Sequence, residues 1–140
     1  MIRNPELFAR ASEWSAGLIT YPNGYPRATD LDSISQAGEK FVVIEAKRIF
    51  MEDLAVPRGQ FMVLSELHRQ LKQPHFSIVG TYGYDMCKPE DIMYYADFKK
   101  ILTKEIPHSY DKYGNLVLNV KNMIPISRRG FSAICDNNLK

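Results

Sequence analysis

The chain has 140 residues, of which 45% are hydrophobic, and its formal net charge is +2. A chain of this size can form one domain with a real core, and its small positive charge permits a polyanionic partner without requiring one. No apolar run approaches the ~18 residues of a membrane span, and the N-terminus lacks the uninterrupted apolar segment of a signal peptide. We therefore expect a single domain over residues 1–140, located in the cytoplasm and not associated with a membrane.

The first part of the chain has the features of a helix followed by a β-hairpin. Asn4 is a suitable cap for a helix over residues 5–18, where apolar residues recur at helical spacing. Alternating residues then predict a strand over 28–35, a turn at 36–39 and a second strand over 40–47. The second strand is rich in β-branched residues, so we expect it to be central and buried.

The rest of the chain predicts helices and strands in mixed order. Residues 50–57 are expected to be irregular, an apolar stripe predicts a helix over 58–72 that Pro74 ends, and residues 76–82 have the pattern of a third core strand. Shorter elements follow: a turn or helix start at 87–91, an edge strand at 92–95, one or two helical turns at 97–102, a turn at 113–115 and a strand at 116–120. The last twenty residues have no clear pattern. The order of elements predicts an α/β fold with a mixed sheet.

Charged residues stand at alternate positions near the ends of the two hairpin strands. Side chains two apart along a strand share a face, so Glu45 and Lys47 project together, as do Asp30 and Asp32. In a hairpin that turns at 36–39, positions whose numbers sum to about 76 or 77 lie opposite each other, which pairs Asp32 with Glu45. The sequence therefore predicts two carboxylates and one ammonium group in a small patch, with Asp30 as the alternative to Asp32.

Two carboxylates in such a patch need positive charge, because buried acids repel each other unless they are paired or bind a metal. Lys47 can neutralise one acid, and a divalent ion would serve both. Oxygen ligands from Asp32, Glu45 and the carbonyl of Ala46 suit Mg²⁺ or Mn²⁺ rather than Zn²⁺. Such a site can hydrolyse a phosphodiester, with Lys47 orienting or helping to deprotonate the attacking water, or stabilising the phosphate. The alternative interpretation is a salt-bridged hairpin in an α/β domain that is not a nuclease.

The pattern TDLD at 29–32 and FVVIEAK at 41–47, followed by a helix that begins near Gln60, resembles the PD-(D/E)XK nuclease superfamily. The resemblance covers roughly residues 5–85, and the 13 residues from Asp32 to Glu45 fit short members such as nuclease-related domain proteins and small Holliday junction resolvases. It implies a restriction endonuclease-like core, in which a helix, a three-stranded meander, a helix and a further strand form a mixed β-sheet flanked by helices. The sequence departs from the superfamily in having no proline immediately before the aspartate.

The resemblance assigns roles to individual residues. Asp32 and Glu45 match the two metal ligands, Lys47 matches the catalytic lysine, and Gln60 matches a glutamine that supports the site in some members. It implies a nuclease that uses Mg²⁺, or Mn²⁺ in its place, to hydrolyse phosphodiester bonds in DNA. An endonuclease of phage, plasmid or junction-resolving type fits the size of the chain, with RNA cleavage and exonucleolytic cleavage as alternatives. Many members add an acid from the first helix, for which the candidates are Glu6 and Glu13.

Basic residues predict where DNA would bind. The first candidate for a phosphate contact is Arg58, near Gln60, and two more are Arg128 and Arg129 in the basic C-terminal segment. Because the chain is close to the minimal size of this fold, we expect it to form a homodimer or to recognise DNA structure rather than a long sequence. A catalytically weak DNA-binding subunit of a larger complex is the alternative, against which the complete set of acids and lysine argues.

Overall fold

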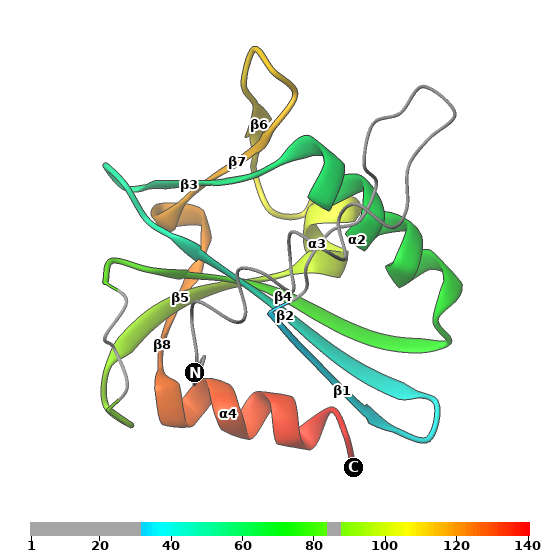
Figure 1. Cartoon of the computed structure of the whole chain (residues 1–140). Coiled ribbons are helices and arrows are strands. Elements are labelled where there is room, and N and C mark those ends of the chain that lie inside the picture. Colours follow the sequence, from blue (N-terminus) through cyan, green and yellow to red (C-terminus); the bar gives the residue numbers. More distant parts are fainter. Residues whose placement is uncertain (1–31, 84–87) are drawn as a thin grey trace, which may run out of the picture. The chain divides into compact units, whose positions relative to one another are not determined.

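The computed structural model describes residues 32–83 and 88–140 (Figure 1). The chain divides into two units, residues 1–30 and residues 31–140, and all described residues belong to the second. The helix expected over 5–18 therefore lies outside the described residues, and so do the candidate acids Glu6, Glu13 and Asp30.

The main sheet has five strands in the order β1-β2-β4-β5-β8. Its strands are β1 (Ser33–Ala37), β2 (Lys40–Arg48), β4 (Gln73–Thr81), β5 (Ile92–Asp97) and β8 (Ile124–Ser127). Strands β2 and β4 are parallel, and the other neighbours pair antiparallel. The predicted α/β class with a mixed sheet is therefore confirmed. Strand β5 lies between β4 and β8, so the prediction that it is an edge strand was wrong.

A second sheet of three strands has the order β3-β7-β6. Its strands are β3 (Asp53–Val56), β7 (Leu116–Asn119) and β6 (Ser109–Tyr110). The expectation that 50–57 is irregular was wrong, because β3 buries alternate residues, Leu54 and Val56, in the manner of a strand. The structure also differs from a three-stranded meander, since the third strand pairs with β7 and not with the main sheet.

Among the described residues, three α-helices accompany the sheets: α2 (Arg58–Gln70), α3 (Phe98–Leu102) and α4 (Arg128–Asn137), with a 3₁₀ turn at Val120–Asn122. In Figure 1, α2 and α3 lie on one side of the main sheet and α4 lies on the other. The helix predicted over 58–72 is confirmed to within two residues, and it ends where Leu71 becomes extended. Within the described part of the chain, no helix is long and apolar enough to cross a membrane.

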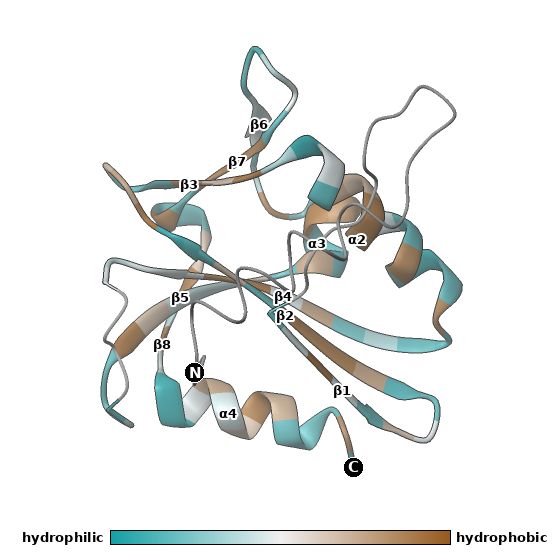
Figure 2. Ribbon diagram, viewed as in Figure 1, coloured by the Kyte–Doolittle hydropathy of each residue, from teal (hydrophilic) through white to brown (hydrophobic). Residues whose placement is uncertain are grey.

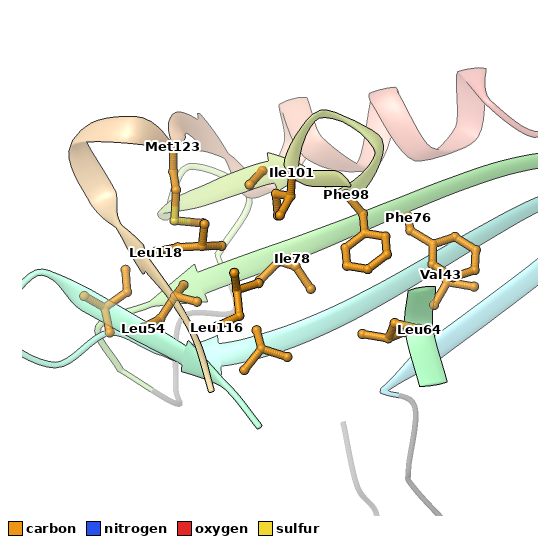
Figure 3. Packing of buried hydrophobic residues seen from close by; sticks show 13 residues of the cluster. Val43, Leu54, Leu64, Phe76, Ile78, Phe98, Ile101, Leu116, Leu118 and Met123 are labelled. Carbon is orange, nitrogen blue, oxygen red and sulfur yellow. The ribbon is translucent and has the colours of Figure 1, made fainter. Parts of the chain in front are cut away.

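The main core lies where the sheet faces α2, α3 and the second sheet (Figure 3). Figure 2 shows the hydrophobic stretches along β2 and β4 that supply one wall of it. Gly80 in β4 allows the second sheet to approach, because a Cβ atom there would lie 2.7 Å from Leu54 Cδ2 and 2.9 Å from Ile49 Cγ1. The largest fully buried side chains of this core are Phe98, Leu64, Ile78, Ile101, Leu116 and Leu118.

Candidate active site

The β1–β2 hairpin sets the register of the predicted site. The two strands pair antiparallel with Ser33 opposite Ile44, and they are joined by a tight turn in which Gly38 has a φ of 62°. Asp32 comes one residue before β1, so the same register places it opposite Glu45. The register predicted from the sequence is therefore confirmed, and it follows from local chemistry, namely strand alternation and a glycine that tolerates positive φ.

Asp32 is fixed against β2 by two hydrogen bonds. Its Oδ2 atom accepts a bond from the backbone N–H of Ala46 at 2.7 Å, and its own N–H donates to Glu45 Oε2 at 3.4 Å. The side chain is exposed, so its carboxylate lies at the entrance to the site. The backbone N–H of Ala46 is thus bonded to Asp32. The carbonyl of Ala46 stays a predicted ligand of the metal.

Glu45 is the buried centre of the site, with 3% of its surface exposed. Its Oε1 atom accepts a hydrogen bond from Gln60 Nε2 at 2.7 Å and lies 3.1 Å from Lys47 Nζ. Gln60 reaches it from the first turn of α2, which begins directly after Pro57. The structure therefore brings together all four residues that the sequence predicted for catalysis, from the residue before β1, the C-terminal half of β2 and the start of α2.

The ionisation of Glu45 is disfavoured in this environment. Burial raises the pKa of Glu45 above its ordinary value, and the neighbouring Asp32 carboxylate adds to this. The hydrogen bond from Lys47 lowers the pKa, but the net direction is upward. The upward shift in the pKa of Glu45 therefore comes chiefly from burial, and the contact with Lys47 offsets only part of it.

The carboxylate oxygens of Asp32 and Glu45 suit a hard divalent cation. Two adjacent carboxylates are the protein ligands that Mg²⁺ commonly uses, with water and substrate phosphate completing its coordination. Over residues 32–83 and 88–140, no group of three or more His, Cys, Asp or Glu side chains is placed to hold a metal. The described residues thus offer a two-carboxylate site, Asp32 and Glu45, and not a closed cage.

The three predicted DNA-contacting arginines lie in two different places. Arg58 is exposed at the start of α2, where its side chain borders Gly114, while Gln60 of the same turn reaches Glu45. Arg128 and Arg129 begin α4 and line a cavity with Ile44 on the opposite face of the sheet. Strand alternation sends Ile44 and Glu45 to opposite faces, so the structure does not bring Arg128 and Arg129 to the site.

One neighbour of the site was missed from the sequence. The backbone N–H of Arg58 donates to Asn115 Oδ1 at 3.0 Å, which attaches the segment between β6 and β7 to the start of α2. The sequence at 113–115 predicted a turn. Nothing in the local pattern indicated that Asn115 would bond to Arg58, which lies 57 positions earlier.

No protein-family model matches the chain, and no curated protein matches it.

Proposed function

We propose that the protein is a metal-dependent hydrolase of phosphodiester bonds, and more specifically a nuclease that acts on DNA. The observation that carries this proposal is the cluster around Glu45, a buried carboxylate beside Asp32 and in contact with Lys47 and Gln60. Burying charges costs free energy even when the charges are paired. Carboxylates with a perturbed pKa and a specific cationic partner are typical of active sites.

Each residue has a role that its contacts support. Asp32 and Glu45 would hold Mg²⁺ or Mn²⁺, which when bound supplies Lewis-acid stabilisation of the charge that develops on the phosphate. Lys47 retains 20% side-chain exposure, so its ammonium group can reach both Glu45 and a substrate, orienting water or contacting the phosphate. Gln60 holds the Glu45 carboxylate in one orientation.

A restriction endonuclease-like core is part of the proposal. The β1–β2 hairpin, the following helix α2 and the parallel strand β4 support it, whereas β3 departs from the expected meander. We further propose endonucleolytic cleavage of phage, plasmid or junction-resolving type, with the protein acting in the cytoplasm and as a homodimer where its substrate is symmetric. Arg58 is the arginine that we propose contacts DNA, because it is exposed on the helix that also carries Gln60.

The test compares two lysines that both form ion pairs. Plasmid, branched and single-stranded DNA, and RNA, are incubated with the wild-type chain, Lys47→Ala and Lys72→Ala, in Mg²⁺, Mn²⁺ or EDTA. Lys72 pairs with Glu39 at 2.9 Å on the exposed surface and is the matched control. We expect DNA cleavage by the wild-type and Lys72→Ala proteins in Mg²⁺, and loss of cleavage in Lys47→Ala or with EDTA.

One result would reject the enzyme, and another would reject the proposed role of Lys47. Tight DNA binding without metal-dependent cleavage would indicate the DNA-binding subunit instead. A Lys47→Ala protein that changed in stability but cleaved normally would indicate a hairpin stabilised by an ordinary ion pair.

A further inference from the structure

Residues 110–115, which comprise the last residue of β6 and the segment that connects it to β7, are joined to the helix that carries Gln60. Besides the bond from Arg58 N–H to Asn115 Oδ1 at 3.0 Å, the Arg58 side chain packs against this segment. A Cβ atom on Gly114 would lie 3.1 Å from Arg58 Cδ. Figure 1 shows the loop beyond β6 projecting from the body of the second sheet. The segment and the candidate active site therefore share the first turn of α2.

This segment, which we call the tip loop, is held in one conformation by its own hydrogen bonds. The Asp111 carboxylate accepts bonds from the N–H of Tyr113 at 2.8 Å and from the N–H of Asn115 at 3.0 Å. Gly114 has a φ of 84°, and its N–H donates to the Asp111 carbonyl at 3.0 Å. The backbone of the tip loop is thus ordered before any ligand binds.

The tip loop displays aromatic rings together with cations. Tyr113 is 69% exposed and Tyr110 is 54% exposed. Lys112 Nζ lies 5.0 Å from the centroid of the Tyr113 ring, and the exposed Arg58 borders the loop. The Tyr110 ring also contacts Phe61 of α2, with 6.2 Å between the centroids, which fixes the base of the loop to the same helix.

Rings and cations in this combination suit one class of ligand. Proteins that bind single-stranded nucleic acid stack bases on exposed aromatic rings and place Lys or Arg beside the backbone phosphates. A base inside an uninterrupted duplex has both faces covered by its neighbours, so a ring can stack on a base only when that base is unpaired or terminal.

We propose that the tip loop binds an unpaired base of the DNA substrate by stacking on Tyr113, with Lys112 and Arg58 beside the backbone phosphates. The identity of the polymer rests on the proposed nuclease function. The inference deepens that function by naming the substrate class: DNA with unpaired nucleotides, such as a single strand, a flap or a branch, rather than continuous duplex.

The experiment measures binding without cleavage, by fluorescence anisotropy in EDTA. The probes are a single-stranded oligonucleotide, a blunt duplex, and the same duplex with a single-stranded flap. The variants are Tyr113→Ala, Tyr113→Phe and Tyr82→Ala, the last altering a tyrosine that is 47% exposed and lies outside the tip loop. Equal melting temperatures and circular dichroism spectra show that all variants are folded.

We expect Tyr113→Ala to weaken binding of the single strand and the flap about 5- to 150-fold, the range that one base–aromatic stack supplies, and to change blunt-duplex binding little. Tyr113→Phe keeps the stacking ring and should bind like the wild-type chain, as should Tyr82→Ala. A 2-aminopurine base in the flap should lose fluorescence on binding the wild-type chain but not Tyr113→Ala.

The inference is overturned if Tyr113→Ala binds all three probes like the wild-type chain, if it weakens binding to all three equally, or if the wild-type chain binds none. These outcomes are distinct from failure of the proposed function, which is read from cleavage in Mg²⁺ by the wild-type and Lys47→Ala proteins. Flap binding that depends on Tyr113, without cleavage, would reject the nuclease and keep the tip-loop site. Cleavage by a protein whose DNA binding does not depend on Tyr113 would support the nuclease and reject the tip-loop site.

Discussion

The side-chain amide of Gln60 donates a hydrogen bond to Glu45 Oε1 over 2.7 Å and thereby joins the first turn of α2 to the centre of β2. The carboxylate also contacts Lys47 and the N–H of Asp32, so among the described residues Gln60 is one of three groups that orient it. Gln60 therefore acts as a positioning residue, through Glu45, and its contribution can be separated from that of Lys47.

Replacing Gln60 with alanine should weaken metal use without removing catalysis. Partners that orient a metal ligand typically contribute 10- to 100-fold to metal affinity or activity, so we expect a loss of about that size in Gln60→Ala. The loss should shrink as Mg²⁺ is raised in a titration of cleavage rate. Gln70→Ala, at the other end of α2, is the matched control and should titrate like the wild-type chain. A Gln60→Ala rate that is unchanged at all Mg²⁺ concentrations would contradict this role.

The raised pKa of Glu45 predicts how stability depends on pH. Because burial raises this pKa, the folded protein binds a proton at Glu45 more readily than the unfolded chain, whose value is near 4.5. In EDTA the contribution of Glu45 to the free energy of unfolding should therefore fall as the pH rises from about 4.5 through the raised pKa. Urea denaturation at a series of pH values checks this.

The matched variants for that measurement are Glu45→Gln and Glu39→Gln. The glutamine in Glu45→Gln cannot titrate, so this variant should lose that part of the pH dependence of the free energy of unfolding. Without metal at neutral pH, it should be more stable than the wild-type chain. Glu39 is exposed in its ion pair with Lys72, so Glu39→Gln should retain the dependence. Identical pH profiles of stability for the wild-type and Glu45→Gln proteins would show that the folded structure does not raise the pKa of Glu45.

His68 predicts a second pH dependence, of opposite sign. Its ring packs edge-on against Phe76 and Phe98, with centroid distances of 5.2 and 5.9 Å, and burial lowers its pKa below 6.5. Asp97 partly offsets this shift and Lys99 adds to it. The folded protein thus holds fewer protons at His68 than the unfolded chain, so stability should fall as the pH drops below about 6.5 and through the lowered pKa.

Denaturation of His68→Gln between pH 7.5 and about 5 checks this, since that variant should lose this acid-side decrease. His108→Gln, in which the altered histidine contacts Tyr110 instead of the core phenylalanines, should keep it. If His68→Gln and the wild-type chain lost stability in parallel, another group would be responsible.

Gly80 gives a test of how the two sheets pack. A methyl group there would meet the side chains of Leu54 and Ile49, each 2% exposed, so we expect Gly80→Ala to lower the free energy of unfolding by about 1–3 kcal/mol. At Gly59 in α2 a Cβ atom meets nothing within 4 Å, and Gly59→Ala should raise stability by up to about 1 kcal/mol. Urea denaturation measures both. Equal stability of Gly80→Ala and the wild-type chain would mean that the second sheet can move away from β4.

The candidate site was predictable because its parts are local. A glycine turn and strand alternation determine the register of Asp32 with Glu45, and both features lie within one hairpin. Gln60 was reached by resemblance and not by pattern. The sequence did not indicate which face of the sheet Arg128 and Arg129 would line, because the position of α4 depends on contacts distant in sequence, which local periodicity does not encode.

The second sheet was missed for a related reason. Strand β3 has four residues, too few to display a period, and its partner β7 lies far along the chain, as the Asp53–Asn119 hydrogen bond across 66 positions illustrates. Strand β8 contains Pro125 and has no buried residue, so it too lacks the alternation that identifies a half-buried strand. In both strands, tertiary pairing decides the structure and intrinsic preference does not.

Strand β1 is the edge of the main sheet, and all five of its residues are exposed. Separating it from β2 would therefore uncover little apolar surface, yet it would carry Asp32 away from Glu45. Local opening of this kind needs much less free energy than global unfolding. A cation or substrate that requires both carboxylates binds only the closed hairpin, so ligand occupancy and hairpin closure are thermodynamically linked. Slower hydrogen exchange at the amides of residues 33–37 would then report that the site is occupied.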